Sequence, residues 1–376
     1  MLLGVDGGAT GIRCHEVRRT REGGPGSYRL GAASAELAYP RLPGFAPVSP
    51  KQQREDLDRA SLTLSAIESE QARVWIDTAA DVISRVVSAT RASSVIIGIG
   101  MPGIKSDNER GIVMMNNGPR MPEFLDQLTD RLTTLGVTLE RSIRRIGDDG
   151  AYAGLGEECA EGGLFRDVRN AYYIGGGTGI AECLKVDGIV VPMSGRSCAV
   201  PRAWELASPM GPTYESLISA AAMNAIYAKL SRSDDNPRHA YPEVAAAAGD
   251  PIALCWLQCV AMLLAHLVHE RLVNLRKAPA SATPDGLDRV IIGQRVGRIF
   301  ADSHLRPLFA DHVESALTHL ILHRGSETSQ DDLTAYLDGD GLRSGFLVAS
   351  NLRAAPAIGA AVDADCGYSG SDNCVM

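Results

Sequence analysis

The chain has few aromatic residues, no excess of basic charge and no signature of a disulfide framework. Aromatic residues make up 5% of its 376 residues, and 37 Lys and Arg stand against 45 Asp and Glu, which gives a net charge of −8. A general nucleic-acid-binding protein needs a basic stripe to neutralise phosphates, and this balance argues against one. We therefore expect no nucleic-acid partner.

The eight cysteines are scattered, and no two of them form a C-x-x-C pair. In a chain of this length such scatter is typical of reduced cytosolic thiols, not of a disulfide scaffold or a zinc cage. Cys255 and Cys259 stand four residues apart in an apolar stretch, where we expect both to be buried as small hydrophobic residues. The cysteine pattern favours a cytoplasmic protein.

Long apolar runs are also lacking. Residues 252–268 contain no Lys, Arg, Asp or Glu, but Gln258 and His266 interrupt them and a charged segment begins at His269. A membrane span needs about 20 apolar residues, so we expect a buried core helix here and no membrane partner. The first residues run directly into a glycine turn, and we expect no signal peptide.

Short apolar runs that end in glycine alternate with segments of helical periodicity. The expected strands cover residues 2–6, 12–18, 94–100, 142–146, 171–175, 290–292 and 346–349, with a hairpin at 181–191. The expected helices cover residues 53–89, 124–135, 214–230, 252–275 and 354–362. Residues 22–49, rich in Gly, Pro, Ser and Ala, are expected to form a long loop or an insertion. The alternation in two halves predicts an α/β protein of two similar lobes.

The first glycine turn follows the first expected strand and reads Asp6-Gly7-Gly8-Ala9-Thr10. Adjacent glycines allow successive backbone amides to point at one place, which suits phosphate oxygens, and Thr10 adds a hydroxyl donor. Asp6 is a candidate for holding magnesium through water. A plain hairpin turn is the alternative interpretation.

The second glycine turn spans Gly175 to Gly179 and contains four glycines and Thr178, more than a hairpin needs. It is a second candidate phosphate-binding turn, with a simple loop as the alternative. Neither turn fits G-x-x-x-x-G-K-[ST], which argues against a P-loop NTPase. Neither shows G-x-G-x-x-G with an acidic residue about 20 positions later, which argues against a dinucleotide-binding fold.

Two carboxylates, Asp148 and Asp149, stand between an expected strand and a helix of small residues. An aspartate in this place could accept a proton from a substrate hydroxyl during phosphoryl transfer. A helix N-cap whose charge complements the helix dipole is the alternative. A glycosidase is not favoured, because no second carboxylate pair is evident.

Taken together, these segments resemble the sugar kinases of the actin/hexokinase/heat-shock ATPase superfamily, most closely the ROK family. The similar segments keep the family's order along the chain. They are the two glycine turns and residues 98–104, 111–113, 116–119, 148–157, 214–219, 274–293 and 350–361. The first turn also resembles that of the N-acetylglucosamine kinase and BadF/BadG branch.

The resemblance implies an α/β, two-lobed actin-like ATPase (ribonuclease H-like) fold with a cleft between the lobes. The first lobe is expected at residues 1–145, completed by a C-terminal helix at about 352–366. The second lobe is expected at residues 146–351. Residues 367–376 are expected to form a disordered tail. The family also implies a homodimer.

The resemblance assigns a role to each candidate site residue. Asp149 takes the place of the catalytic base, and Asp6 that of the residue that positions hydrated Mg²⁺. The residues implied to bind the cofactor ATP are Asp6, Gly7, Gly8, Thr10, Gly176, Gly177, Thr178, Gly179, Gly293 and Gln294. The residues implied to bind the sugar are Pro102, Gly103, Asn117, Asp148 and Glu215.

The implied activity is ATP-dependent phosphorylation of a hydroxyl of a hexose, an amino sugar or a related polyol. Asp148 replaces the family's Asn and Gln294 replaces a glycine, so the sugar and nucleotide contacts differ from those of a standard glucokinase. The family's zinc loop is missing, and no zinc is expected. A BadF-like ATPase and a catalytically altered sugar-binding protein are the alternatives. Lys105 and Arg120 are expected to be solvated loop charges, with contact to an acidic substrate group as the alternative.

Overall fold

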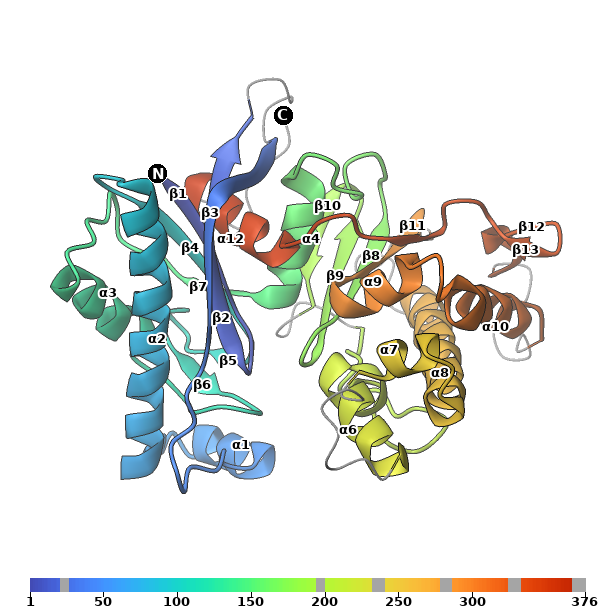
Figure 1. Ribbon diagram of the computed structural model, residues 1–376, viewed down its shortest axis with the longest axis horizontal. Helices are drawn as coiled ribbons and strands as arrows, with labels where there is room; N and C mark the ends of the chain where they lie inside the picture. Colours follow the sequence, from blue (N-terminus) through green and yellow to red (C-terminus); the bar gives the residue numbers. More distant parts are fainter. Residues whose placement is uncertain (21–26, 194–199, 232–240, 278–285, 324–332, 367–376) are drawn as a thin grey trace. The chain divides into compact units, whose positions relative to one another are not determined.

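The chain forms two compact units. A computed structural model describes residues 1–20, 27–193, 200–231, 241–277, 286–323 and 333–366 (Figure 1). The first unit combines Met1–Gly163 with Ala354–Met376, and the second is Leu164–Arg353. The expected disordered tail at 367–376 lies outside the described residues.

The first unit is built on a five-stranded sheet in the order β3-β2-β1-β4-β7. The strands are β1 (Leu2–Gly7), β2 (Gly11–Arg19), β3 (Tyr28–Ala38), β4 (Ile96–Met101) and β7 (Ile146–Asp148). Strands β1, β2 and β3 pair antiparallel, whereas β4 runs parallel to both β1 and β7. A separate hairpin joins β5 (Ile104–Lys105) to β6 (Ile112–Met114).

Helices cover both faces of this sheet (Figure 1). They are α2 (Ala66–Thr90), α3 (Phe124–Thr134), α4 (Asp149–Cys159) and α12 (Ala355–Cys366). A further helix, α1 (Pro50–Asp58), packs against β6 of the separate hairpin. Because side chains alternate along a strand, Leu3 and Val5 of β1 join the apolar core with α2 and α3. The residue between them, Gly4, faces α12 on the other side.

Two expectations for the first unit are corrected. Residues 28–38, expected in a loop, form the edge strand β3, because their backbone pairs with β2 from Gly11 to Arg19. Its many small residues give little contrast between apolar and polar positions, which concealed this strand in the sequence. The expected helix at 53–89 is two helices, α1 and α2, and the second begins after Ser65, whose side chain accepts a hydrogen bond from the amide of Glu68.

The unit boundary also differs from the expected one. β7 and α4 were expected to open the second lobe, but both belong to the first unit. β7 pairs with β4, and α4 packs along α12. Close backbone contact fixes this packing: a Cβ on Gly156 would lie 2.1 Å from the carbonyl oxygen of Ala355.

Glycines in the central strands let α12 pack directly on the sheet. A Cβ on Gly98 of β4 would lie 1.8 Å from the carbonyl oxygen of Ala360. We expect Gly98→Ala to lower the free energy of unfolding by about 1–3 kcal/mol, because overpacking pushes the helix off the sheet. Urea denaturation measures this. Gly341→Ala, with no atom within 4 Å of its Cβ, is the control, and equal stability of the two variants would contradict the prediction.

The second unit repeats the sheet of the first. Its order is β10-β9-β8-β11-β14, in which β8, β9 and β10 pair antiparallel and β11 runs parallel to β8 and β14. The strands are β8 (Ala171–Gly176), β9 (Ile180–Val186), β10 (Ile189–Pro192), β11 (Arg289–Gly293) and β14 (Leu347–Ala349). The expected hairpin is confirmed, with Asp187 and Gly188 both at positive φ.

The remaining elements surround this second sheet. They are α5 (Glu215–Ile218), α6 (Ala220–Ser231), α7 (Pro242–Ala247), α8 (Pro251–Lys277), α9 (Gln294–Ala301), α10 (Ala310–His323), the 3-10 helices η2 (Arg306–Leu308) and η3 (Thr334–Tyr336), and the short hairpin β12 (Leu337–Asp338) and β13 (Gly341–Leu342). The expected helix at 214–230 is interrupted at Ser219, whose backbone is extended.

Helix α8 supplies much of the second core, as expected for residues 252–268. Within the described residues, Pro251–Arg276 is the one stretch with the length and composition of a membrane span, and 56% of its apolar window is buried inside the protein. The two cysteines on α8 are not buried as expected: Cys255 is exposed and Cys259 is half-buried. Cys259 still packs against the edge of the core.

Candidate active site

Three parallel strands of the first unit end side by side and bring acidic residues to one edge of the sheet. In the register of the sheet, Asp6 of β1 pairs with Gly100 of β4, and Met101 of β4 pairs with Asp148 of β7. Asp149 follows at once as the first residue of α4. Ligands of open α/β sheets bind outside the carboxyl ends of the strands, and these aspartates lie at that edge.

Asp149 is half-buried, and its carboxylate is poorly solvated. The pKa of Asp149 is raised to about 7, mainly by burial and then by the nearby charges of Asp148 and Asp6, whereas Lys105 opposes the rise. The backbone amide of Gly150 donates to Asp149 Oδ1 at 3.0 Å. A carboxyl group with a pKa near neutrality is suited to accept a proton at physiological pH.

Asp148 acts as the N-cap of α4. Its Oδ1 accepts a hydrogen bond from the amide of Ala151 at 3.0 Å, and its backbone is extended. Of the two carboxylates, Asp148 is therefore the helix N-cap. Its hydrogen bond fixes where α4 begins. Because α4 begins there, Asp149 is held in the first turn of the helix.

Asp6 is the second carboxylate with a raised pKa at this edge. Burial raises the pKa of Asp6 to about 6, although Arg13 lowers it and Glu36 adds a smaller increase. Arg13 and Glu36 form an ion pair at 2.8 Å on the neighbouring strands β2 and β3. Asp6 and Asp149 thus repel each other at one site, which a bound cation would relieve.

The first glycine turn is tightly closed. The amide of Gly8 donates to the carbonyl oxygen of Gly11 at 2.8 Å, and the carbonyl oxygen of Thr10 accepts from the amide of Tyr39 at 3.0 Å. A Cβ on Gly7 would lie 1.9 Å from the sulfur of Met101. Gly7 is therefore required for the packing of β1 against β4, and the Gly8 amide is engaged within the turn.

The segment after β4 brings Pro102, Gly103 and Lys105 to the same edge. Gly103 has φ +94, a conformation that glycine adopts without strain. Lys105 is half-buried, and its Nζ donates to the carbonyl oxygens of Met101 at 2.5 Å and Gly103 at 2.8 Å. Asn117 lies on the exposed loop after β6, and none of the described contacts joins it to Asp149.

Arg120, expected to be a solvated loop charge, is instead 2% exposed. Its guanidinium group pairs with Glu68 at 2.8 Å and Asp56 at 2.7 Å, and it also donates to the carbonyl oxygen of Thr63. Arg120 therefore ties its loop to the region of α1 and α2. Lys105 departs from the same expectation, since it is bonded to backbone carbonyls and not free in solvent.

The second glycine turn gathers its predicted residues within the second unit. The amide of Gly177 donates to the carbonyl oxygen of Gly179 at 2.9 Å, and the carbonyl oxygen of Gly177 accepts from the amide of Ala220 at 2.8 Å. Gly176 forms a bridge with Gln294, which follows Gly293 at the end of β11. Thr178 is half-buried in the turn.

Two side chains border this turn closely. A Cβ on Gly177 would lie 2.4 Å from Gln294 Oε1, and one on Gly179 would lie 2.9 Å from Glu215 Oε2. Gln294 has φ +56, which is uncommon for a residue other than glycine. Glu215, expected to contact the sugar, accepts a hydrogen bond from the amide of Ile180 at 2.9 Å, and burial raises its pKa.

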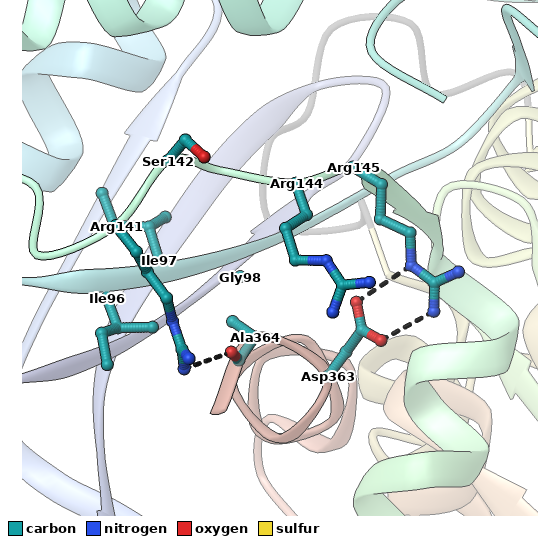
Figure 2. A pocket seen from close by; sticks show the side chains of 9 residues that line it. All are labelled: Ile96, Ile97, Gly98, Arg141, Ser142, Arg144, Arg145, Asp363 and Ala364. Carbon is teal, nitrogen blue, oxygen red and sulfur yellow. Dashed lines mark hydrogen bonds and ion pairs between the residues drawn. The ribbon is translucent and has the colours of Figure 1, made fainter. Parts of the chain in front are cut away.

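Two surface cavities lie apart from these residues. One, of about 20 Å³, is lined by Arg141, Arg144, Arg145 and Asp363 at the start of β4 (Figure 2). Asp149 lies near the other end of that strand, where Met101 pairs with Asp148. There Arg145 forms two hydrogen bonds with Asp363, and Arg141 donates to the carbonyl oxygen of Ala364 at the end of α12. The other, of about 850 Å³, lies between α10 and the segment 340–348.

Among the described residues, no three His, Cys, Asp or Glu side chains are arranged to hold a metal directly. Mg²⁺ commonly keeps most of its water and uses one or two carboxylates together with substrate phosphates. Asp6, a half-buried carboxylate next to a second one, fits that mode of binding.

No family model and no curated protein matches this sequence. Solved structures match it over nearly its whole length. A ROK family glucokinase from Streptomyces griseus, in complex with glucose and AMPPNP, has a TM-score of 0.57 at 15% identity and covers 96% of this chain and 97% of its own. A ROK hexokinase from Thermus thermophilus has a TM-score of 0.52 at 16% identity, with 97% and 98% covered.

A ROK family protein from Streptococcus pneumoniae, in complex with sucrose, has a TM-score of 0.51 at 16% identity and covers 97% of both chains. This chain has the ROK fold. The expected α/β fold class with two similar halves is confirmed. Within the ROK fold, Asp6 and Asp149 occupy one sheet edge, and the second glycine turn follows the matching strand of the repeat, β8.

Two contributors to the site were not evident from the sequence. Met101 lies at the register position of Asp148 and packs its sulfur against Gly7. Tyr39 stacks on Trp75 with ring centroids 3.9 Å apart, and its hydroxyl reaches the Met101 sulfur at 3.9 Å. The unexpected strand β3 ends just before Tyr39, so recognising that strand would have found it.

Proposed function

We propose that this protein transfers the γ-phosphoryl group of ATP to a hydroxyl group of a sugar. The observation that carries the proposal is the environment of Asp149: a half-buried carboxyl group at the carboxyl ends of three parallel strands, with a pKa raised to about 7. Structures of the same fold with glucose and AMPPNP, and with sucrose, support this class of substrate.

In the proposed reaction, Asp149 accepts the proton of the sugar hydroxyl as its oxygen attacks the γ-phosphorus. The bond between the γ-phosphorus and the β,γ-bridging oxygen breaks, and ADP leaves. The N-cap bond of Asp148 and the Gly150 amide keep Asp149 oriented. Positioning of this kind, with a base of matched pKa, provides much of the catalysis in phosphoryl transfer.

Magnesium, when bound, neutralises charge that develops on the phosphates. Asp6 of the first unit is the residue proposed to hold it through water. In the second unit, Gly176, Thr178 and Gly179 are proposed to bind phosphate oxygens, with Gln294 beside them, while the Gly177 amide closes the turn on Gly179. Fixed backbone amides stabilise such charge because they need no reorganisation during the reaction.

The proposed acceptor is a hexose, an amino sugar or a related polyol. In the first unit Pro102, Gly103, Asn117 and Asp148 are proposed to contact it. Asp148 Oδ1 already accepts the Ala151 amide, so we propose that the rest of that carboxylate receives a sugar hydroxyl. Glu215, at the second glycine turn, is proposed to orient that turn as well as the sugar. A cytoplasmic location is proposed from the cysteine pattern, and a homodimer from the family resemblance.

The test is a coupled assay of ADP release from Mg-ATP over a panel of hexoses, amino sugars, polyols and sugar acids. We expect release to depend on at least one of these compounds, and mass spectrometry of that reaction to show a phosphorylated product. ADP release of equal rate with and without every sugar would favour a BadF-like ATPase. Sugar binding without any ADP release would favour a sugar-binding protein.

A further inference from the structure

Three sulfur-containing side chains lie on the solvent-accessible face of α8 in the second unit. Cys255, Cys259 and Met262 are spaced i, i+4 and i+7, and at 3.6 residues per turn this spacing holds them within an arc of about 60°. Cys255 is exposed, Cys259 is half-buried and Met262 is 52% exposed. Cysteine is among the residues most often fully buried. A cysteine pair that faces water therefore calls for an explanation in its chemistry and not in its packing.

The two thiols are close enough to interact with each other. The pKa of Cys259 is raised mainly by burial and then by the neighbouring Cys255, through its charge and through a hydrogen bond between the thiols. Cys259 is therefore a neutral thiol at physiological pH and not an activated nucleophile. A disulfide between the two is also disfavoured, because positions i and i+4 hold their Cβ atoms about 5–6 Å apart, whereas a disulfide needs about 3.5–4.5 Å.

A metal ion can span this gap without unwinding the helix. Two metal–sulfur bonds of about 2.3 Å bridge sulfur atoms up to about 4.6 Å apart. Met262 provides a thioether one turn further along, and long side chains on a helix lean toward its N-terminus, which is the direction of Cys259. His266 follows on the same face, but at 1.5 Å of rise per residue it stands about 16 Å along the axis from Cys255, too far to share one ion.

The chemistry of these donors selects the ion. Thiolate and thioether ligands are soft and favour Cu(I), whereas a structural Zn²⁺ takes four ligands drawn from Cys, His and carboxylates. In the part of the chain that the structure describes, no third Cys, His, Asp or Glu joins the two thiols in a group that could hold a metal. The thioether of Met262 is the third donor that the helix supplies, and it counts toward copper and not toward zinc.

We propose that Cys255, Cys259 and Met262 form a surface site for one Cu(I) ion. Binding forms three copper–sulfur bonds and releases the two thiol protons to solvent, with no change in the oxidation state of copper or sulfur. All three ligands come from one helix, which sets their spacing before the metal arrives. The site lies within the second unit and does not depend on the proposed kinase activity.

The first test is an anaerobic titration of the full chain with Cu(I) in competition with bicinchoninate, a coloured chelator of Cu(I). We expect Cys255→Ser and Cys259→Ser each to withdraw one equivalent of copper less than the parent. Cys159→Ser, at the half-buried cysteine that ends α4 in the first unit, is the matched control and should withdraw as much as the parent. Equal copper uptake by the parent and the two α8 variants would overturn the site.

The second test identifies the thioether ligand. In protein grown with selenomethionine and loaded with one equivalent of Cu(I), X-ray absorption at the copper edge should detect selenium beside sulfur in the first shell. We expect the selenium contribution to vanish in Met262→Leu and to persist in Met210→Leu, at a methionine of the second unit that is 59% exposed. A first shell of sulfur without selenium in the parent, or selenium that persists in Met262→Leu, would overturn the three-sulfur site.

Discussion

Asparagine in place of Asp149 lowers sugar-dependent ADP release by about 10²–10⁴-fold, because it cannot accept the proton of the sugar hydroxyl. The substitution keeps the size of the side chain, and its carbonyl oxygen can still accept the Gly150 amide that now bonds to Asp149 Oδ1. The coupled assay measures the loss at saturating sugar and Mg-ATP. Circular dichroism checks that the variant is folded.

The control for this prediction is Asp130→Asn, at an exposed aspartate on α3 of the same unit, which should keep the parent's rate. A rate near that of the parent in Asp149→Asn would remove Asp149 from the mechanism. The parent itself should gain kcat/KM as the pH rises through about 7, because only the carboxylate can act as the base.

The same carboxyl group links stability to pH. Its pKa in the folded protein is raised above the ordinary value of 3.8, so its stabilising contribution is present below that value and is lost as the pH rises toward about 7. Asparagine does not ionise and avoids this loss. The Asp149→Asn variant should therefore resist thermal unfolding better than the parent above pH 7, and no better near pH 4.

Replacing Arg271 by methionine should lower the free energy of unfolding of the second unit by about 3–5 kcal/mol. Its guanidinium group pairs with Glu182 at 2.6 Å, and the two side chains are 0% and 1% exposed. Glu182 also accepts from the Tyr172 hydroxyl at 2.5 Å and from the Ala203 amide at 2.6 Å. Without the arginine, a buried negative charge keeps only these neutral donors.

Urea unfolding followed by tryptophan fluorescence measures this effect. In a Trp75→Phe background, the remaining tryptophans, Trp204 and Trp256, both lie in the second unit and report on it alone. Adding Glu182→Gln to Arg271→Met should recover much of the loss, because the buried charge is then removed. If the double variant were no more stable than Arg271→Met, the cost would come from packing and not from the unpaired charge.

Much of the fold could be predicted because its strands are apolar runs that end in glycine. Residues 94–100 and 171–175 show this pattern, and they form β4 and β8 within a residue or two of the expected bounds. A parallel strand that is covered on both faces needs such a run, so the sequence signal is strong. The long helix α8 was likewise evident from its uncharged stretch.

The elements that were missed depend on pairing and packing that local composition does not show. β3 is an edge strand of small residues, and only its register with β2 defines it. The assignment of α4 to the first unit depends on its packing against α12, about 200 residues later, where the Gly359 position approaches the Tyr152 carbonyl oxygen. Local composition does not contain such information, since tertiary packing overrides propensity.

For the candidate site, the sequence identified the carboxylates but not their surroundings. Asp6 and Asp149 were singled out because each ends a strand next to glycine, and the structure does bring them to one edge. Lys105 was interpreted as a solvated charge, because nothing in the sequence shows that its side chain folds back on β4. Likewise, the position of Glu215 beside Gly179 follows from a turn formed by two remote segments.

The return of the chain to its starting unit affects the order in which the protein can fold during synthesis. β1 and β4 leave one face of their sheet to be covered by α12, which the ribosome makes after the whole of the second unit. The second unit is a single continuous stretch and can complete its core first. The first unit, although its strands emerge earlier, exposes apolar surface until residues 355–366 arrive, and chaperones are expected to bind it during that interval.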